Sequence, residues 1–257
     1  MFGICTLSIV PCRKEPAHRS EMVTQLLFGE HFSILEKKNS WCRIKIAHDA
    51  YECWVEQKQI TEISEKSFLL LNKTPANFAL DLVQIVSAQN PEMLFPIVIG
   101  SILPSLKNKD FSIEKNKFSY EGQAKKIIKF SKNSIVENAY LFLNTPYLWG
   151  GRSPFGIDCS GFTQIVYRLS GMNLQRDAHQ QATQGETLNF VEEAESGDLA
   201  FFDNEDGKII HVGIVLPENK IIHASGKVRV DTLDHYGIFN VAEKKYSHTL
   251  RLLKRMD

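Results

Sequence analysis

Cys159 is the first residue in this sequence whose setting favours chemistry, because a helix is expected to begin beside it. Residues 146–152, before it, are rich in glycine and contain proline, which is typical of a loop. Residues 162–169, after it, have the apolar spacing of a helix that ends at Ser170 and Gly171. Unpaired backbone N–H groups and the positive end of a helix dipole favour an anion at such a position. We therefore predict that Cys159 is a nucleophile and that the pKa of its thiol is lowered.

Two histidines further along the chain can supply the base that a thiol nucleophile needs. Residues 208–216 and 220–226 have strand-like patterns, and the turn between them predicts a hairpin. His211 lies in the first strand and His223 in the second. One imidazole in an apolar strand is usually a hydrogen-bonded core residue, but two on paired strands, after an Asp-Cys-Ser-Gly run, favour catalysis. A nucleophile, a base and a residue that orients the base are the three parts of nucleophilic catalysis.

The composition limits the classes of partner and cofactor. The chain has 257 residues, 43% of them hydrophobic, enough for one large domain or a few small ones with packed cores. Thirty basic and thirty acidic residues give a formal net charge of zero, so neither a nucleic-acid nor a membrane partner is expected. The five cysteines form no C-x-x-C pair and no metal-ligand spacing, so we expect no metal and no cofactor.

The beginning of the chain predicts a location. Residues 1–11 lack a basic segment, and their apolar run is short and interrupted by Thr6 and Ser8. They are expected to form a first strand, not a signal peptide, and no apolar run is long enough to span a bilayer. The expectation is a cytoplasmic protein with reduced thiols.

The N-terminal half is expected to consist of β-structure. Residues 64–130 are expected to form a second SH3-like or irregular β domain, with a plain linker as the alternative. Within them, residues 78–87 fit neither a helix nor a strand period cleanly, and three prolines between residues 91 and 104 exclude a long helix. Before them, five short strands predict a small SH3-like barrel in residues 1–63, at residues 4–10, 22–27, 31–37, 41–47 and 51–55.

Residues 131–257 are expected to form an α+β domain. Residues 134–143 predict an amphipathic helix with Ser134 as N-cap and Glu137 completing a capping box. The helix after Cys159 and a short helix at residues 177–183 follow. Helices followed by antiparallel strands are typical of the α+β class. The strand-like runs occupy residues 198–202, 208–216, 220–224, 228–232 and 247–253.

Several motifs resemble known families. From about residue 134 to the C-terminus the sequence is similar to the NlpC/P60 family of papain-like cysteine peptidases, in the order and spacing of five motifs. These are residues 146–151, 158–162, 197–202, 211–214 and 223–224. Residues 10–13, 25–30, 41–44 and 51–55 resemble the markers of a bacterial SH3 (SH3b) domain, although Cys53 stands where glycine is usual. The resemblance implies a papain-like NlpC/P60 catalytic domain at residues 131–257, preceded by small all-β SH3-like barrel domains at residues 1–63 and 64–130.

The resemblance implies roles for four catalytic residues. Cys159 would attack the scissile carbonyl, His211 would take up and return the proton, and His223 would hold the His211 ring in a productive tautomer. Tyr147 stands where the family has a tyrosine whose hydroxyl helps to hold the oxyanion. The alternative for Tyr147 is a packed aromatic ring beside Trp149.

A substrate clamp is implied as well. In the cytoplasmic recycling branch of the family, the positions of Glu21, Tyr51, Asp158 and Ser160 resemble a clamp for the free amino group of an N-terminal L-alanine. A carboxylate suits a buried ammonium, because an uncompensated charge there would be costly. The alternatives are N-capping of the helix by Asp158 and Ser160, and solvated surface positions. Further candidates, for contact with a carboxylate of the diamino acid or for the surface, are Arg152, Arg176 and Asp177.

The function implied by the resemblance is that of a γ-D-glutamyl-L-diamino acid peptidase with a cysteine nucleophile. Its substrate would be a murein peptide with a free N-terminal L-alanine, cleaved after γ-D-glutamate to release L-Ala-γ-D-Glu during cell-wall peptide recycling. The main alternative is a secreted peptidoglycan hydrolase that acts on the intact wall, with its SH3b domains as anchors. A wall-binding module with an inert catalytic domain and an acyltransferase on the same fold are further alternatives.

Overall fold

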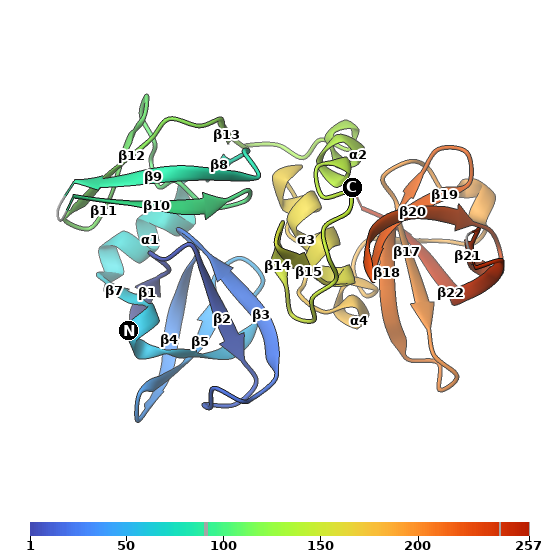
Figure 1. The fold of residues 1–257 in the computed structure, drawn as a ribbon, viewed down its shortest axis with the longest axis horizontal. Coiled ribbons are helices and arrows are strands. Elements are labelled where there is room, and N and C mark those ends of the chain that lie inside the picture. Colours follow the sequence, from blue (N-terminus) through green and yellow to red (C-terminus); the bar gives the residue numbers. More distant parts are fainter. Residues whose placement is uncertain (90–91, 242, 257) are drawn as a thin grey trace. The chain divides into compact units, whose positions relative to one another are not determined.

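The chain forms two compact units in a computed structural model that describes residues 1–89, 92–241 and 243–256 (Figure 1). The first unit comprises Met1–Ile128 and the second Lys129–Asp257. Each unit has a hydrophobic core of its own. None of the described helices is long and apolar enough to cross a membrane.

A seven-stranded antiparallel sheet, of the order β3-β2-β6-β5-β4-β1-β7, begins the first unit. The strand predicted at residues 4–10 is interrupted, because β1 pairs with β4 and β7 whereas β2 pairs with β3 and β6. Eleven buried residues fill the core of this barrel, and four of them are cysteines that pack as small apolar side chains. The strands are β1 (Phe2–Ile4), β2 (Ile9–Arg13), β3 (Met22–Leu27), β4 (His31–Lys38), β5 (Trp41–Ile46), β6 (Glu52–Glu56) and β7 (Thr61–Ile63).

A helix and a second sheet complete the first unit. The four main strands have the order β10-β9-β12-β11, and β8 pairs with β13. Phe28, which follows β3, meets Phe111 and Phe118 edge-on with ring centroids 5.9 and 5.8 Å apart, so the two sheets share a core. The elements are η1 (Gln57–Gln59), α1 (Glu65–Lys73), β8 (Asn77–Ala79), β9 (Val83–Gln89), β10 (Glu92–Val98), β11 (Asp110–Ile113), β12 (Asn116–Tyr120) and β13 (Ala124–Lys126).

The second unit combines helices with an antiparallel sheet, which confirms the predicted α+β class. The sheet order is β16-β22-β17-β18-β19-β20-β21, and β22 also pairs with β21, so six strands form a closed ring. All eleven residues of α3 are buried, and α3 packs on β18. The elements are α2 (Asn133–Tyr140), β14 (Arg152–Ser153), β15 (Gly156–Ile157), α3 (Cys159–Leu169), α4 (Ala178–Gln181), β16 (Glu186–Leu188), η2 (Val191–Glu193), β17 (Leu199–Asp203), β18 (Ile209–Leu216), β19 (Lys220–Ser225), β20 (Lys227–Leu233), β21 (Gly237–Asn240) and β22 (Lys245–Arg255).

Local differences from the sequence prediction have identifiable causes. Within residues 78–87, residues 78–79 belong to β8 and residues 83–87 to β9, and none is helical, because β8 pairs with β13 and β9 pairs with two neighbours. The sequence pattern does not predict α1, since none of its residues is fully buried and only Phe68 and Leu71 pack against the core. Ser134 lies inside α2 instead of capping it, because its hydroxyl donates to the carbonyl of Ser131 at 2.8 Å.

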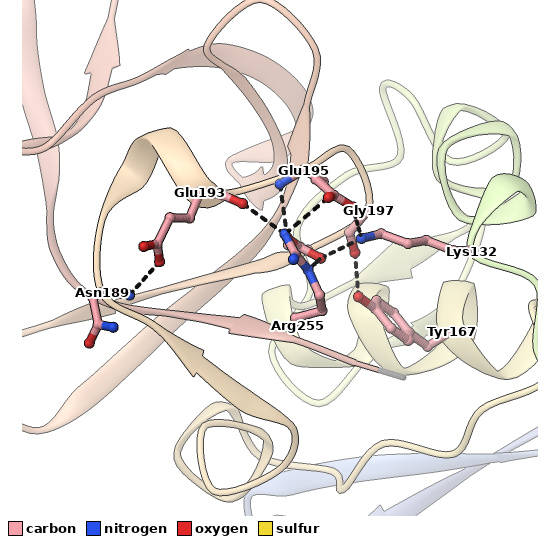
Figure 2. Close-up of polar contacts among 8 residues, drawn as sticks. Lys132, Tyr167, Asn189, Glu193, Glu195, Gly197 and Arg255 are labelled. Atoms are coloured by element: carbon pink, nitrogen blue, oxygen red, sulfur yellow. Dashed lines mark hydrogen bonds and ion pairs between the residues drawn. The ribbon is translucent and has the colours of Figure 1, made fainter.

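A network of ion pairs joins α2 to β22 in the second unit (Figure 2). The buried Asp198 carboxylate lies 3.0 Å from Lys132 Nζ and 2.9 Å from Arg255 Nη2. Next to it, the hydroxyl of Tyr167 donates to the carbonyl oxygen of Gly197, which links α3 to the same point. The network therefore ties the helix that begins the unit to the strand that closes the ring.

We expect Asp198→Asn to lower the free energy of unfolding by about 1–3 kcal/mol, because two cations lose their shared carboxylate. Lys132 and Arg255 are 27% and 23% exposed, so water limits the loss. Urea and thermal unfolding measure it. Glu195→Gln, at a 64% exposed position of the same network, is the matched control and should leave the free energy of unfolding unchanged within experimental error. Equal stability of the Asp198 variant and the wild type would contradict the anchoring role.

Candidate active site

Asp158 fixes the start of α3. Its Oδ1 accepts a hydrogen bond from the N–H of Gly161 at 2.6 Å, and its Oδ2 accepts one from the N–H of Gly150 at 2.8 Å. Position 161 requires glycine, since an added Cβ would lie 2.3 Å from the carbonyl oxygen of Gly151. Asp158 is thus the N-cap, one of its two predicted roles, and Cys159 is the first residue of α3, as the sequence predicts.

Arg176 neutralises Asp158 inside the domain. Its Nη1 and Nη2 lie 3.0 and 2.6 Å from the two carboxylate oxygens, and both side chains are buried. Nη1 also donates to the hydroxyl of Ser160 at 2.9 Å, so this hydroxyl is held by the ion pair and does not cap the helix. A bidentate pair of this kind is strong and directional. The surface alternative is wrong for Arg176 and for Arg152, because both are buried.

Burial, and not the helix terminus, dominates the ionisation of Cys159. Burial and the negative charge of Asp158 raise the pKa of the thiol to about 12, against the N–H groups of Val212 and Ser160 and the charge of Arg176. The predicted fall in the thiol pKa is therefore wrong for the substrate-free protein. Burial removes more hydration energy from the thiolate than the N–H groups and the dipole at the helix start supply. Cys159 is a neutral thiol at neutral pH and needs a base to become a nucleophile.

Tyr147 offers a hydrogen-bond donor near this thiol. Burial, followed by electrostatic interaction with Cys159 and Asp158, raises the pKa of its hydroxyl to about 12. The hydroxyl is therefore within electrostatic range of the nucleophile. The Tyr147 backbone is fixed by a 3.0 Å hydrogen bond from its N–H to the carbonyl of Gly226. The hydroxyl stays protonated and is able to donate to an oxyanion.

His211 and His223 meet across β18 and β19. His223 lies opposite Gly213 in the strand register, and side chains two residues apart share a face, so His211 projects to the same side. The ring planes are 86° apart, and His211 Nε2 lies 2.8 Å from His223 Nδ1. Position 213 requires glycine, because an added Cβ would lie 2.9 Å from the Cβ of His223. The N–H of Val212 reaches the Cys159 thiol, so the histidine pair adjoins the nucleophile.

A carboxylate fixes the proton positions on both rings. Asp231 Oδ2 lies 3.0 Å from His223 Nε2. Burial lowers the pKa of both His211 and His223, so both rings are neutral. An ionised carboxylate only accepts hydrogen bonds, so the proton of His223 is on Nε2 and its lone pair is on Nδ1. His211 Nε2 must then donate to that lone pair. Nδ1 of His211 is left as a free base.

Three residues around the histidine pair are missed by sequence reasoning. Arg229 Nε lies 2.7 Å from Asp231 Oδ2, and the ring of His248 stacks on that of His211 with centroids 4.1 Å apart. The alternation of Arg229 and Asp231 in the strand predicted at residues 228–232 is a signal that could have found them. The sequence lacks the register of β19 against β20 that makes it meaningful. His248 comes from β22, two strands away from β18, and no sequence pattern links the two.

The remaining predicted site residues divide between the units. Glu21 belongs to the first unit, where it forms a 3.2 Å ion pair with Lys14. Tyr51 belongs to the same unit and packs against the barrel core. Their contact with a substrate stays a prediction. Asp177 forms a capping box with Gln180 at the start of α4. The second unit contains the other predicted site residues, which are Tyr147, Asp158, Cys159, Ser160, His211 and His223.

Two family models match the chain. The model of the NlpC/P60 family matches residues 144–248, which include Cys159 and the histidine pair. The model described as a bacterial dipeptidyl-peptidase SH3 domain matches residues 12–60, in the seven-stranded sheet of the first unit. Each match coincides with one of the two resemblances seen in the sequence.

Related proteins extend the similarity over most of the chain. Two are named gamma-D-glutamyl-L-lysine dipeptidyl-peptidase. The one from Bacillus cereus is 25% identical over 232 residues, which are 80% of this chain and 68% of that protein. The one from Bacillus subtilis is 27% identical over 242 residues, which are 87% and 75% of the two chains. The crystal structure of an NlpC/P60 family protein from Bacillus cereus covers 99% of both chains with a TM-score of 0.82 at 19% identity, which shows a common fold.

A thiol at a helix start, near a neutral imidazole with a free nitrogen, supplies the nucleophile and the base of a cysteine hydrolase. The chain carries an NlpC/P60 domain together with a bacterial SH3 domain. The chain is therefore a peptidase with an NlpC/P60 domain, and the comparisons support peptidoglycan peptides as the class of molecule that it hydrolyses.

We expect the Cys159 thiol to react slowly with iodoacetamide in the substrate-free protein. A thiol with a pKa of about 12 is far less ionised at neutral pH than free cysteine, whose pKa is about 8.5. Mass spectrometry of the peptide that contains Cys159, after timed alkylation, measures the rate, with free cysteine as the reference. A reaction faster than that of free cysteine at neutral pH would show that the thiolate already forms before substrate binds.

Proposed function

We propose that the protein hydrolyses the γ-D-glutamyl–diamino acid bond of murein peptides with a free N-terminal L-alanine and releases L-Ala-γ-D-Glu. The observation that carries this proposal is the similarity to two gamma-D-glutamyl-L-lysine dipeptidyl-peptidases over 80% and 87% of the chain. Matches of this length extend well beyond the NlpC/P60 match at residues 144–248, so they concern more than the chemistry common to the family. The arrangement of Cys159, His211 and His223 supports the hydrolytic step.

Cys159 is the nucleophile in this proposal, and His211 is the general base. As Cys159 Sγ attacks the γ-carbonyl carbon, the thiol proton passes to Nδ1 of His211. The Tyr147 hydroxyl and the backbone N–H of Cys159, at the start of α3, stabilise the oxyanion. When the tetrahedral intermediate collapses, the C–N bond breaks and the imidazolium returns the proton to the leaving amine. Water then hydrolyses the thioester with His211 as base again, and the dipeptide leaves.

His223 and Asp231 act through His211. Their hydrogen bonds keep the proton of His211 on Nε2, and only this tautomer accepts the thiol proton at Nδ1. When His211 becomes positively charged, the Asp231 carboxylate stabilises it through the intervening ring. Among the described residues, no hydrogen bond joins the Cys159 thiol to an imidazole, and such bonds commonly tighten when substrate binds.

The free amino group of the substrate is assigned to Glu21, Tyr51, Asp158 and Ser160. An enzyme that removes a dipeptide has to recognise the chain end two residues before the scissile bond, and the relatives' names include the word dipeptidyl-peptidase. Asp158 is compensated by the buried Arg176, whereas the Lys14 partner of Glu21 is exposed and weakly held, so most of the charge that attracts an ammonium has to come from Glu21. In this assignment Ser160 and Tyr51 contribute hydroxyl oxygens that accept from the ammonium.

We assign the protein to the cytoplasm and to the recycling of peptides released from the wall. All five cysteines are free and buried, which is compatible with a reducing compartment. A peptide that retains a free N-terminal L-alanine has lost its link to the glycan strands, so it is a soluble fragment and not part of the intact wall. The proposed preference for soluble fragments and the proposed cytoplasmic location therefore support each other.

Product analysis by mass spectrometry tests the proposed reaction. The purified protein is incubated with L-Ala-γ-D-Glu-meso-diaminopimelate, the corresponding lysine peptide, their N-acetylated forms and intact peptidoglycan. We expect L-Ala-γ-D-Glu from a free tripeptide only. Acetylation should lower kcat/KM about 100-fold or more, because it removes a charge that several hydrogen bonds recognise. Cys159→Ala is the inactive control.

Other outcomes of this experiment have equally definite meanings. Equal rates with free and acetylated peptides would remove the amine clamp. Preferential release of peptides from intact peptidoglycan would replace the proposal with a wall hydrolase, in which the SH3 domain anchors the enzyme. No cleavage of any substrate by the folded wild-type protein would contradict the proposed function altogether.

Asp231→Asn should lower kcat about 10²- to 10⁴-fold, because it moves the proton of each histidine ring to the other nitrogen. The amide nitrogen would donate to His223 Nε2, so His223 would carry its proton on Nδ1 and donate to His211 Nε2. The proton of His211 would then be on Nδ1, where it blocks the base. Steady-state kinetics measure the loss, and KM should change little.

The exposed Asp206 provides the matched control, since Asp206→Asn makes the same chemical change away from the site. Its kcat should stay within about twofold of the wild type. Thermal unfolding of both variants separates a tautomer effect from a loss of folded protein. A folded Asp231→Asn variant with the wild-type kcat would show that Asp231 does not set the state of His211.

A further inference from the structure

Three imidazoles converge at one point of the second unit. His211, His223 and His248 come from β18, β19 and β22, and one nitrogen of each ring lies within 4.8 Å of the others. The hydrolytic mechanism uses His211 and His223 and assigns no task to His248. His248 stacks on His211 with ring centroids 4.1 Å apart, and its centroid lies 5.8 Å from that of His223. Imidazole nitrogens at this separation are typical ligands of zinc and similar transition metals.

His223 is already oriented as a metal ligand. Metal-binding histidines usually donate their other ring N–H to a carboxylate, which fixes the tautomer and raises the basicity of the ligating nitrogen. His223 Nε2 donates to Asp231 at 3.0 Å, and this leaves the Nδ1 lone pair toward the cluster. Arg229 holds the same carboxylate at 2.7 Å. The outer half of a carboxylate–histidine–metal arrangement is therefore present.

His248 completes the cluster from the more accessible side. Its Nδ1 lies 2.9 Å from the hydroxyl of Ser247, to which the Nδ1 proton can be donated, and Nε2 then keeps a lone pair. His248 is half-buried whereas His211 and His223 are buried, so an ion can enter past it. The ring of Phe202, 5.8 and 5.9 Å from those of His211 and His248, forms an apolar wall beside the cluster.

A metal needs a shift of the three nitrogens and a rotation of the His248 ring, which is now stacked on His211 at 22°, so that all lone pairs point at one ion. Zinc–nitrogen bonds of about 2.0–2.1 Å in a tetrahedron place the nitrogens about 3.4 Å apart. His211 Nε2 and His223 Nδ1, now 2.8 Å apart, would separate by about 0.6 Å. The ligating nitrogen of His248, which is 4.8 Å at most from the other two, would move inward by up to about 1.4 Å. A water molecule would occupy the fourth position.

We propose that His211, His223 and His248 form a binding site for a divalent transition metal such as Zn²⁺, and that the bound metal inhibits the peptidase. The metal takes the lone pair of Nε2 on His211, whose proton moves to Nδ1, so the ring stays neutral. Nδ1 is the nitrogen that receives the thiol proton in the proposed reaction, and the metal-bound enzyme therefore lacks its base. Metal binding follows from the geometry alone, whereas the inhibition rests on the proposed function.

Calorimetry on the inactive variant tests the site without any assay of activity. Zn²⁺ is titrated into Cys159→Ala protein in a buffer that does not chelate it, so the thiolate is excluded as a ligand. We expect one site, and an affinity at least tenfold lower when His248→Phe is added, because phenylalanine keeps the stacking and removes the nitrogen. His235→Phe, at an exposed histidine outside the cluster, should leave the affinity unchanged. No binding, or equal affinity in all three proteins, would overturn the proposal.

Kinetics test the inhibition. Zn²⁺ should inhibit the wild type, and EDTA should restore its rate. The His248→Phe variant should keep the basal rate within about threefold of the wild type, and its half-inhibition should need at least ten times more Zn²⁺. His248→Gln, checked by thermal unfolding, serves if the phenylalanine variant does not fold. Unchanged sensitivity in the His248 variants would show that Zn²⁺ acts through Cys159 instead, against the proposal. A wild type that cleaves no murein peptide even without Zn²⁺ would contradict the proposed function and leave the calorimetric result standing.

Discussion

The buried ion pair between Asp158 and Arg176 positions the rest of the active site. The Asp158 carboxylate accepts hydrogen bonds from the N–H groups of Gly150 and Gly161. The Arg176 guanidinium compensates its charge and donates to the hydroxyl of Ser160. Removing Arg176 would leave an unpaired buried charge, at a cost of about 3–5 kcal/mol. The cap on α3 would weaken with it. The position of Cys159 thus depends on two charges that take no part in bond breaking.

A second buried carboxylate paired with an arginine lies beside the histidine pair. Asp231 orients the histidine pair and is itself held by Arg229, so each buried carboxylate of the site has an arginine of its own. The reacting groups between them carry no charge at rest, because burial keeps the thiol protonated and the imidazoles neutral. The buried site therefore contains no uncompensated charge before substrate binds. The thiolate and the imidazolium form only when a substrate carbonyl is present to react with the sulfur.

Sequence reasoning succeeds here where a local pattern decides the outcome. The strand at residues 22–27 and the helix that begins at Cys159 follow from alternation, a glycine loop and a cap. It fails where tertiary structure decides. The thiol pKa rises because α3 is buried along its whole length, and Asp231 matters only because of its register against His223. Family resemblance supplied the candidate catalytic residues, but the proton positions on the histidines depend on Asp231, which lies on the neighbouring strand β20.

The closed ring of strands constrains how a substrate is recognised. Every strand from β17 to β22 has a hydrogen-bonded neighbour on both sides along part of its length, so the described part of the ring has no edge that is open throughout. Strand addition, which is the most general way to hold an L-peptide backbone, is limited to short stretches such as residues 209–212 of β18, which pair with β17 only. Most of the recognition has to come from side chains and from loop backbone. This suits a peptide joined through a γ-carboxyl group and built with a D-residue, whose backbone lacks the regular spacing of a β-strand.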